Sequence, residues 1–213
     1  MPETLASATP SCCCAAAAAT KPVASAVAPP APVSGRFELV DHFGQAVNQG
    51  SFGAQHLLVF FGFSHCAVVC PRELSKLSAA LEMLGPLAER VQPLYISVDP
   101  ARDTPAVLQR YLSQYTHPTA HPTAHPATHA AGGFLGLTGS PEQVEAAKKS
   151  FRVFAAPVPD DNAPGGYVVP HTALAYLMAP GGSYATHFAE TLDAATVSAR
   201  LRTHLERTAD AAN

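Results

Sequence analysis

Two cysteines separated by three residues, Cys66 and Cys70, are the side chains most capable of chemistry in this sequence. The spacing lets both sulfur atoms converge on one point, so the pair can close a disulfide or bind a soft metal ion such as Cu(I) or Zn(II). Pro71 suits the first turn of a helix, which would place Cys70 at the N-cap. Because the free N–H groups and the helix dipole stabilise a thiolate there, we predict a lowered pKa for the Cys70 thiol.

A third ligand is needed, since two sulfur atoms leave the coordination shell of a metal ion incomplete. Among the ten histidines, His171 is the best candidate because it opens a predicted strand immediately after Pro170. Each signal alone is weak: a C-x3-C pair can consist of unreactive structural thiols, and a lone histidine is more often an ordinary surface or core residue. A purely redox role for Cys66 and Cys70 would not need His171.

The cysteine pair lies between two clear secondary-structure signals. The nearly continuous apolar run from His56 to Phe63 predicts a central strand covered on both faces. Leucines then repeat at helical spacing until Gly85 and Pro86 end the pattern. Open α/β sheets bind ligands where a strand meets a helix N-terminus, so this placement favours a functional pair.

Predicted strands and helices alternate along the rest of the chain. The expected strands lie within 37–47 (a hairpin), 91–98, 134–137, 151–158, 171–178 and 184–188, and the expected helices begin at Thr104-Pro105, at the capping box Ser140–Gln143 and near Val197. This order predicts an α/β fold with a central mixed β-sheet flanked by helices and an N-terminal β-hairpin.

Composition suggests one globular domain with extensions. Residues 1–34, rich in Ala, Pro, Ser and Thr, are expected to be a low-complexity tail or linker. The domain is expected over 35–208, with a His/Pro-rich loop insert at 117–133 and a disordered C-terminus at 209–213. The apolar content of 47% is enough for a sizeable core.

Charge and hydropathy exclude some classes of function. The 13 basic and 16 acidic side chains give a formal charge of -3 without a basic cluster, so we expect no nucleic-acid partner. The longest apolar stretch, 57–63, is far shorter than the roughly 20 residues of a membrane-spanning helix. We read no export signal in the sequence.

Several motifs, in order, resemble those of the Sco (SenC) family over about residues 36–205. They are FFGFSHC (60–66), CP (70–71), ISVDPARDTP (96–105), GLTGS (136–140) and HT (171–172) followed by LM (177–178). The set is much more specific than any one motif. Arg102 and Asp103 match the family's loop, where they could present a helix cap or contact a partner.

The resemblance implies a thioredoxin-like fold and a copper metallochaperone for the dinuclear copper centre of cytochrome c oxidase subunit II or a similar copper-receiving protein. It matches Cys66, Cys70 and His171 to the family's copper ligands, with copper as Cu(I) and also as Cu(II). The alternative is a thiol-disulfide oxidoreductase that keeps the oxidase cysteines reduced, with Cys66 and Cys70 as its redox pair and a thiol-disulfide reductant as a partner. The resemblance also implies an extracytoplasmic location, in the periplasm or attached to a membrane facing it.

Three residues depart from the family pattern. Ala67 and Val68 stand where members often have proline and aspartate, which makes the cysteine loop more apolar. Pro170 stands where members commonly have an aspartate, which removes a carboxylate that could orient His171. A peroxiredoxin-type peroxidase is disfavoured, because Val59 and Phe63 occupy the positions of its proline and hydroxyl residue.

The tract 117–129 repeats histidine and proline every four residues. We favour a tandem expansion in a tolerant loop; the alternative is a weak site that gathers copper for the cysteine pair. If the tract gathers copper, deletion of 117–129 will lower the copper stoichiometry measured under weakly competing conditions. Unchanged uptake and delivery would exclude this role.

Overall fold

The computed structural model describes residues 32–115 and 133–210. Nearly all of the predicted N-terminal tail, the insert as far as residue 132, and residues 211–213 lie outside the described residues. The predictions made for them, including the role of the histidine tract, therefore remain predictions.

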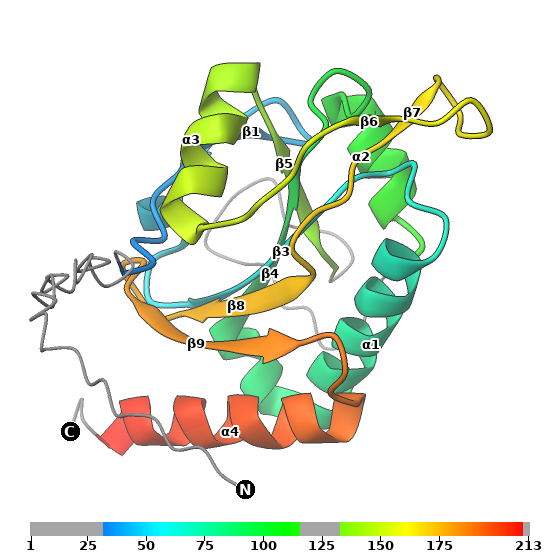
Figure 1. The fold of residues 1–213 in the computed structure, drawn as a ribbon. Coiled ribbons are helices and arrows are strands. Elements are labelled where there is room, and N and C mark those ends of the chain that lie inside the picture. Colours follow the sequence, from blue (N-terminus) through cyan, green and yellow to red (C-terminus); the bar gives the residue numbers. More distant parts are fainter. Residues whose placement is uncertain (1–31, 116–132, 211–213) are drawn as a thin grey trace, which may run out of the picture. The chain divides into compact units, whose positions relative to one another are not determined.

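A seven-stranded mixed sheet forms the centre of the described chain, with the strand order β2-β1-β5-β4-β3-β8-β9 (Figure 1). The strands are β1 (Glu38–Asp41), β2 (Ala46–Asn48), β3 (His56–Gly62), β4 (Val91–Ser97), β5 (Leu135–Thr138), β8 (Leu174–Met178) and β9 (Tyr184–Ala189). Strands β3, β4 and β5 run parallel, whereas β1 and β8 run antiparallel to their neighbours. The expected α/β fold with a mixed sheet and an N-terminal hairpin is confirmed.

The described residues form four α-helices and two short 3-10 helices. They are η1 (Gln49–Phe52), α1 (Val69–Leu84), η2 (Gly85–Arg90), α2 (Pro105–Leu112), α3 (Pro141–Phe151) and α4 (Ala194–Asp210). The Thr104 side chain caps α2, and Ser140 and Gln143 form the predicted capping box of α3. Helix α4 continues past residue 208, where we expected the domain to end.

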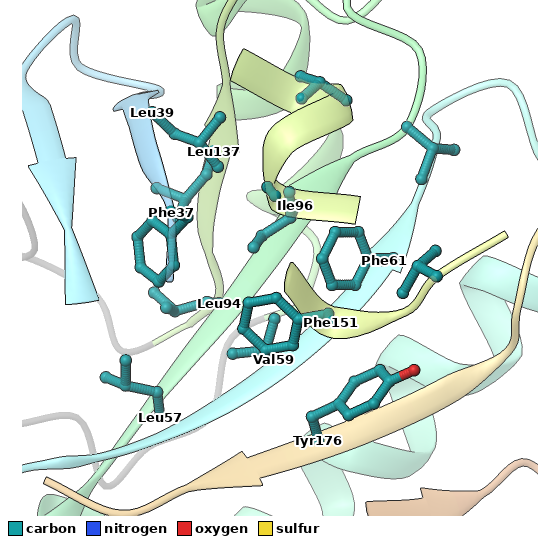
Figure 2. Close-up of a cluster of buried hydrophobic side chains, with 14 of the residues drawn as sticks. Phe37, Leu39, Leu57, Val59, Phe61, Leu94, Ile96, Leu137, Phe151 and Tyr176 are labelled. Atoms are coloured by element: carbon teal, nitrogen blue, oxygen red, sulfur yellow. The ribbon is translucent and has the colours of Figure 1, made fainter. Parts of the chain in front are cut away.

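Alternating side chains of β3 face two apolar clusters, one on each side of the sheet. Leu57, Val59 and Phe61 pack against the hairpin and α3, and Figure 2 shows Phe61 beside Phe151 and Tyr176 in this cluster. The intervening side chains of β3 pack against α1, α2 and α4 on the other face. Strand β3 is thus covered on both faces, as its unbroken apolar sequence predicts.

The strand predicted over 151–158 is wrong. Helix α3 continues to Phe151, and Arg152 then adopts a left-handed conformation with φ 59° that ends the helix. The first regular strand after the helix is β6 (Val158–Pro159), which forms a separate two-stranded sheet with β7 (Tyr167–Val168). The strand predicted from His171 likewise begins only at Leu174, since His171 makes just an isolated bridge with Ala155.

Phe151 and Phe154 lie three residues apart in opposite environments. The Phe151 ring is fully buried, 5.2 Å from Phe61 and 5.4 Å from Tyr176 between ring centroids, whereas Phe154 is 69% exposed. We expect Phe151→Ala to lower the free energy of unfolding by about 3–5 kcal/mol, because it leaves a cavity. Phe154→Ala is the matched control and is expected to change it by less than about 0.5 kcal/mol. Chemical denaturation measures both, and equal effects would contradict the packing described here.

Candidate metal centre

The cysteine loop connects the end of β3 to the start of α1. Helix α1 begins at Val69 with Val68 at the N-cap, so Cys70 lies inside the first turn and the prediction that it is the N-cap residue is wrong. The Val68 side chain has no group that can cap and makes no capping hydrogen bond. Cys70 is fully buried, whereas Cys66 is partly exposed, and both thiols are free.

The helix N-terminus acts on Cys66 rather than on Cys70. The backbone N–H of Cys70 donates to the Cys66 sulfur at 3.4 Å. The hydrogen bond from the Cys70 side chain, aided by backbone N–H groups and opposed by burial, lowers the pKa of Cys66 to about 5. The hydrogen bond with Cys66 and burial raise the pKa of Cys70, so the predicted lowering of the Cys70 pKa is wrong.

His171 lies close to the Cys70 sulfur although the two residues are 101 positions apart in the sequence. The distance from Cys70 Sγ to His171 Nε2 is 3.8 Å. The ring Nδ1 lies 2.9 Å from the Val169 carbonyl oxygen, which can only accept, so Nδ1 carries the proton. The Nε2 lone pair therefore faces the sulfur, which is the orientation that a metal-binding imidazole requires.

The separation between Cys70 and His171 fits a metal ion placed between them. Bonds of about 2.3 Å to sulfur and about 2.0 Å to nitrogen, as zinc makes them, separate the two ligand atoms by about 3.7 Å at an angle of about 120°. Within residues 32–115 and 133–210, no group of three or more His, Cys, Asp or Glu side chains is already arranged to hold an ion. The structure thus brings Cys70 close to Cys66 and to His171, and a three-ligand shell requires Cys66 to turn toward the same point.

Gly62 makes room for the buried sulfur. A Cβ atom at this position would lie 2.6 Å from the Tyr95 hydroxyl oxygen and 2.7 Å from Cys70 Sγ, both closer than atoms can approach. This role was not predicted from the sequence, although a glycine inside an apolar strand often marks a close approach of other atoms.

Asp103 fixes the start of the cysteine loop. Its fully buried carboxylate accepts from the Ser64 backbone N–H at 3.2 Å, the Ser64 hydroxyl at 2.5 Å and the Ser97 hydroxyl at 2.6 Å. The residue therefore ties the loop before α2 to the segment that carries Cys66.

Arg102 fixes the β6–β7 hairpin beside the site. Its guanidinium donates to the carbonyl oxygens of Pro164 at 2.7 Å and Tyr167 at 3.2 Å, and pairs with Asp99. The guanidinium carbon also lies 3.7 Å from the centre of the Tyr167 ring, whose hydroxyl donates to Asp99. Of the two interpretations of this loop, the structure supports a structural role for both Arg102 and Asp103.

A pocket of about 580 Å³ opens in front of the site. His65, Cys66 and His171 line it together with apolar side chains, among them Val68, which is 66% exposed. An incoming molecule can therefore reach Cys66 and His171, while Cys70 lies behind them.

The difference between the two thiols predicts their alkylation. We expect the rate of Cys66 modification by iodoacetamide in the metal-free, reduced protein to be half-maximal near pH 5 rather than near 9, and Cys70 to react far more slowly because it is buried and protonated. Peptide-resolved mass spectrometry measures both rates and separates them from those of Cys12 to Cys14. Cys70→Ala removes the main hydrogen bond to Cys66 and is expected to move the Cys66 profile to higher pH; an unchanged profile would contradict this cause.

Comparison with known proteins places the chain in a family. The sequence profile described as SCO1/SenC matches residues 25–206. The chain is 34% identical over 174 residues to the mitochondrial SCO2 homologue of Danio rerio, covering 81% of this chain and 57% of that protein. It spans less than two thirds of the length of the first curated relatives it matches, at 57% and 59%.

Solved structures show the same fold. The copper-bound structure of Bradyrhizobium japonicum ScoI superimposes with a TM-score of 0.66 at 36% identity, covering 80% of this chain and 98% of that one. Copper-bound yeast Sco1 superimposes with a TM-score of 0.68 at 34% identity, covering 83% and 90%. The expected thioredoxin-like fold is confirmed, and the chain belongs to the SCO1/SenC family.

Proposed function

We propose that this protein is a copper metallochaperone that binds Cu(I) through Cys66, Cys70 and His171 and passes it to another protein. The observation that carries the proposal is the 3.8 Å contact between Cys70 Sγ and His171 Nε2, with the imidazole held in the tautomer that leaves Nε2 free. Two thiolates and an imidazole are soft and borderline ligands, which favour Cu(I) over hard cations.

The solved relatives support copper as the ion. Bradyrhizobium japonicum ScoI and yeast Sco1, at 36% and 34% identity, were both crystallised with copper bound. Copper is the cargo in this proposal, so the site must release the ion as well as bind it. A partly exposed Cys66 at the mouth of a pocket permits exchange with ligands of a receiving protein.

The receiving protein that we propose is cytochrome c oxidase subunit II, at its dinuclear copper centre. The motifs shared with the Sco family support this assignment. We further propose an extracytoplasmic location, on the same family basis. No helix in the described part of the chain is long and apolar enough to cross a membrane.

The alternative, a thiol-disulfide reductase, uses the same thiols. The low pKa of Cys66 would suit attack on a disulfide. That chemistry gives no role to His171, which the fold nevertheless brings to the Cys70 sulfur in a defined tautomer. The geometry therefore favours metal binding.

An anaerobic Cu(I) competition titration tests the proposal. We use the full chain with Cys12, Cys13 and Cys14 replaced by serine, so that Cys66 and Cys70 are its only thiols. We expect one tight equivalent, an affinity lowered about tenfold or more by His171→Ala, and no tight binding in Cys66→Ser/Cys70→Ser.

His187→Ala is the matched control for the histidine, because His187 is exposed and does not line the pocket. It is expected to leave the affinity unchanged. Absence of tight binding in the parent, or an affinity indifferent to His171→Ala, would shift the assignment to the reductase.

A further inference from the structure

His65, which directly precedes Cys66, lies at the exposed end of a hydrogen-bonded chain that runs through Ser64 to Asp103. His65 Nδ1 lies 3.0 Å from the Ser64 hydroxyl oxygen, and that hydroxyl lies 2.5 Å from the Asp103 carboxylate. Asp103 is fully buried and accepts a second hydroxyl from Ser97. The far end of the chain is thus fixed in the core, while the His65 side chain is exposed.

The hydrogen bonds of the Ser64 hydroxyl determine the tautomer of His65. The Ser64 hydroxyl has one hydrogen, and it is directed to the Asp103 carboxylate. Ser64 Oγ can therefore only accept from His65, so the proton lies on Nδ1 and Nε2 is left with a free lone pair. Metal-binding histidines are typically oriented in this way, with the second ring nitrogen donating to a carboxylate or a group linked to one.

This imidazole lines the pocket in front of the proposed copper site. His65, Cys66 and His171 line the same pocket, with Cys70 buried behind them. Both imidazoles of the pocket have Nδ1 occupied by a hydrogen bond, from His171 to the Val169 carbonyl and from His65 to Ser64. The exposed one stands on the solvent side, where an ion enters or leaves.

We propose that His65 is an exchange ligand, which binds copper through Nε2 only while the ion passes between this protein and its donor or acceptor. The inference rests on the proposed copper function and adds a ligand to it.

The exchange conserves charge and the number of ligands. As the bond from Cu(I) to Cys70 Sγ breaks, a bond to His65 Nε2 forms, and the ion keeps Cys66 as its thiolate ligand. The released Cys70 thiolate takes up a proton from solvent, and copper stays Cu(I) throughout. Ligands of the acceptor, thiolates among them, then replace His65, His171 and Cys66 one after another, so each bond from this chain to the ion breaks as a bond to the acceptor forms.

Stopped-flow transfer of Cu(I) to bathocuproine disulfonate tests the proposal, in the full chain with Cys12 to Cys14 replaced by serine. We expect His65→Ala to slow transfer about tenfold while the equilibrium Cu(I) affinity stays within about twofold. His187→Ala is the matched control, because His187 is also exposed and also bonded through Nδ1 to a hydroxyl, that of Tyr184. It is expected to leave the rate unchanged.

Ser64 variants test whether the orientation of the His65 ring matters, and not only its presence. Ser64→Ala breaks the link to Asp103 and is expected to slow transfer about threefold, whereas Ser64→Thr keeps the hydroxyl and the parent rate. Long-range ¹H–¹⁵N NMR of the metal-free protein above pH 7.5 is expected to show the Nδ1–H tautomer of His65 in the parent and a shift toward Nε2–H in Ser64→Ala.

The possible results separate this inference from the proposed function. Tight binding with an unchanged transfer rate in His65→Ala would overturn the exchange role alone, as would the Nε2–H tautomer in the parent. A loss of affinity as large as that of His171→Ala would make His65 a resident ligand and also overturn it. If the parent binds no Cu(I) tightly, the proposed function fails and the inference fails with it.

Discussion

The buried carboxylate of Asp103 is the interaction on which the arrangement of the site depends. A carboxylate removed from water is costly unless its oxygens are hydrogen-bonded, and here Ser64 and Ser97 supply the donors. Burial raises the pKa of Asp103 and these hydrogen bonds oppose the rise. Because Ser64 ends the run that leaves β3 and Ser97 ends β4, one side chain fixes the carboxyl ends of two parallel strands and the start of the cysteine loop.

The position of His171 depends on a second, separate set of contacts. The segment that carries His171, just before β8, forms no regular strand. It is held by the Ala155–His171 bridge, and Arg102 hydrogen-bonds to the β6–β7 hairpin that precedes it. Arg102 follows Asp99 and precedes Asp103 in the same short loop. That loop therefore positions both halves of the site, the cysteine segment through Asp103 and the histidine segment through Arg102.

Local signals predicted most elements of the fold, and long-range contacts account for the errors. The caps at Thr104 and Ser140 and the apolar run of β3 are encoded by neighbouring residues, and the structure has them as predicted. The prediction of a strand at 151–158 was wrong because Phe151 packs into the core as the last residue of α3. The sequence of 151–158 is typical of a strand and does not reveal this tertiary contact.

The same distinction applies to the site. The spacing and motifs predicted Cys66, Cys70 and His171 as ligands, and the fold brings His171 to Cys70, while metal binding by the three residues stays a prediction. The sequence could not show that the helix begins one residue before Cys70. Because of this start, the free N–H groups of the first turn stabilise the thiolate of Cys66 and not that of Cys70. Nor could the sequence show the roles of Gly62, Asp103 and His65, because each depends on a contact that only the folded chain makes.

The two thiols of the site differ in exposure and in pKa, and this difference favours one order of ligand binding over the other. Cys66 is partly exposed and favours the thiolate, so it can capture an ion from solvent or a partner. Cys70 is buried and favours the protonated thiol, so it binds an ion only after losing a proton in an apolar setting. In the proposed copper function, binding to Cys70 would therefore follow capture by Cys66, and release would proceed in the reverse order. Such an order suits the proposed carrier function, since a carrier must release its ion as well as bind it.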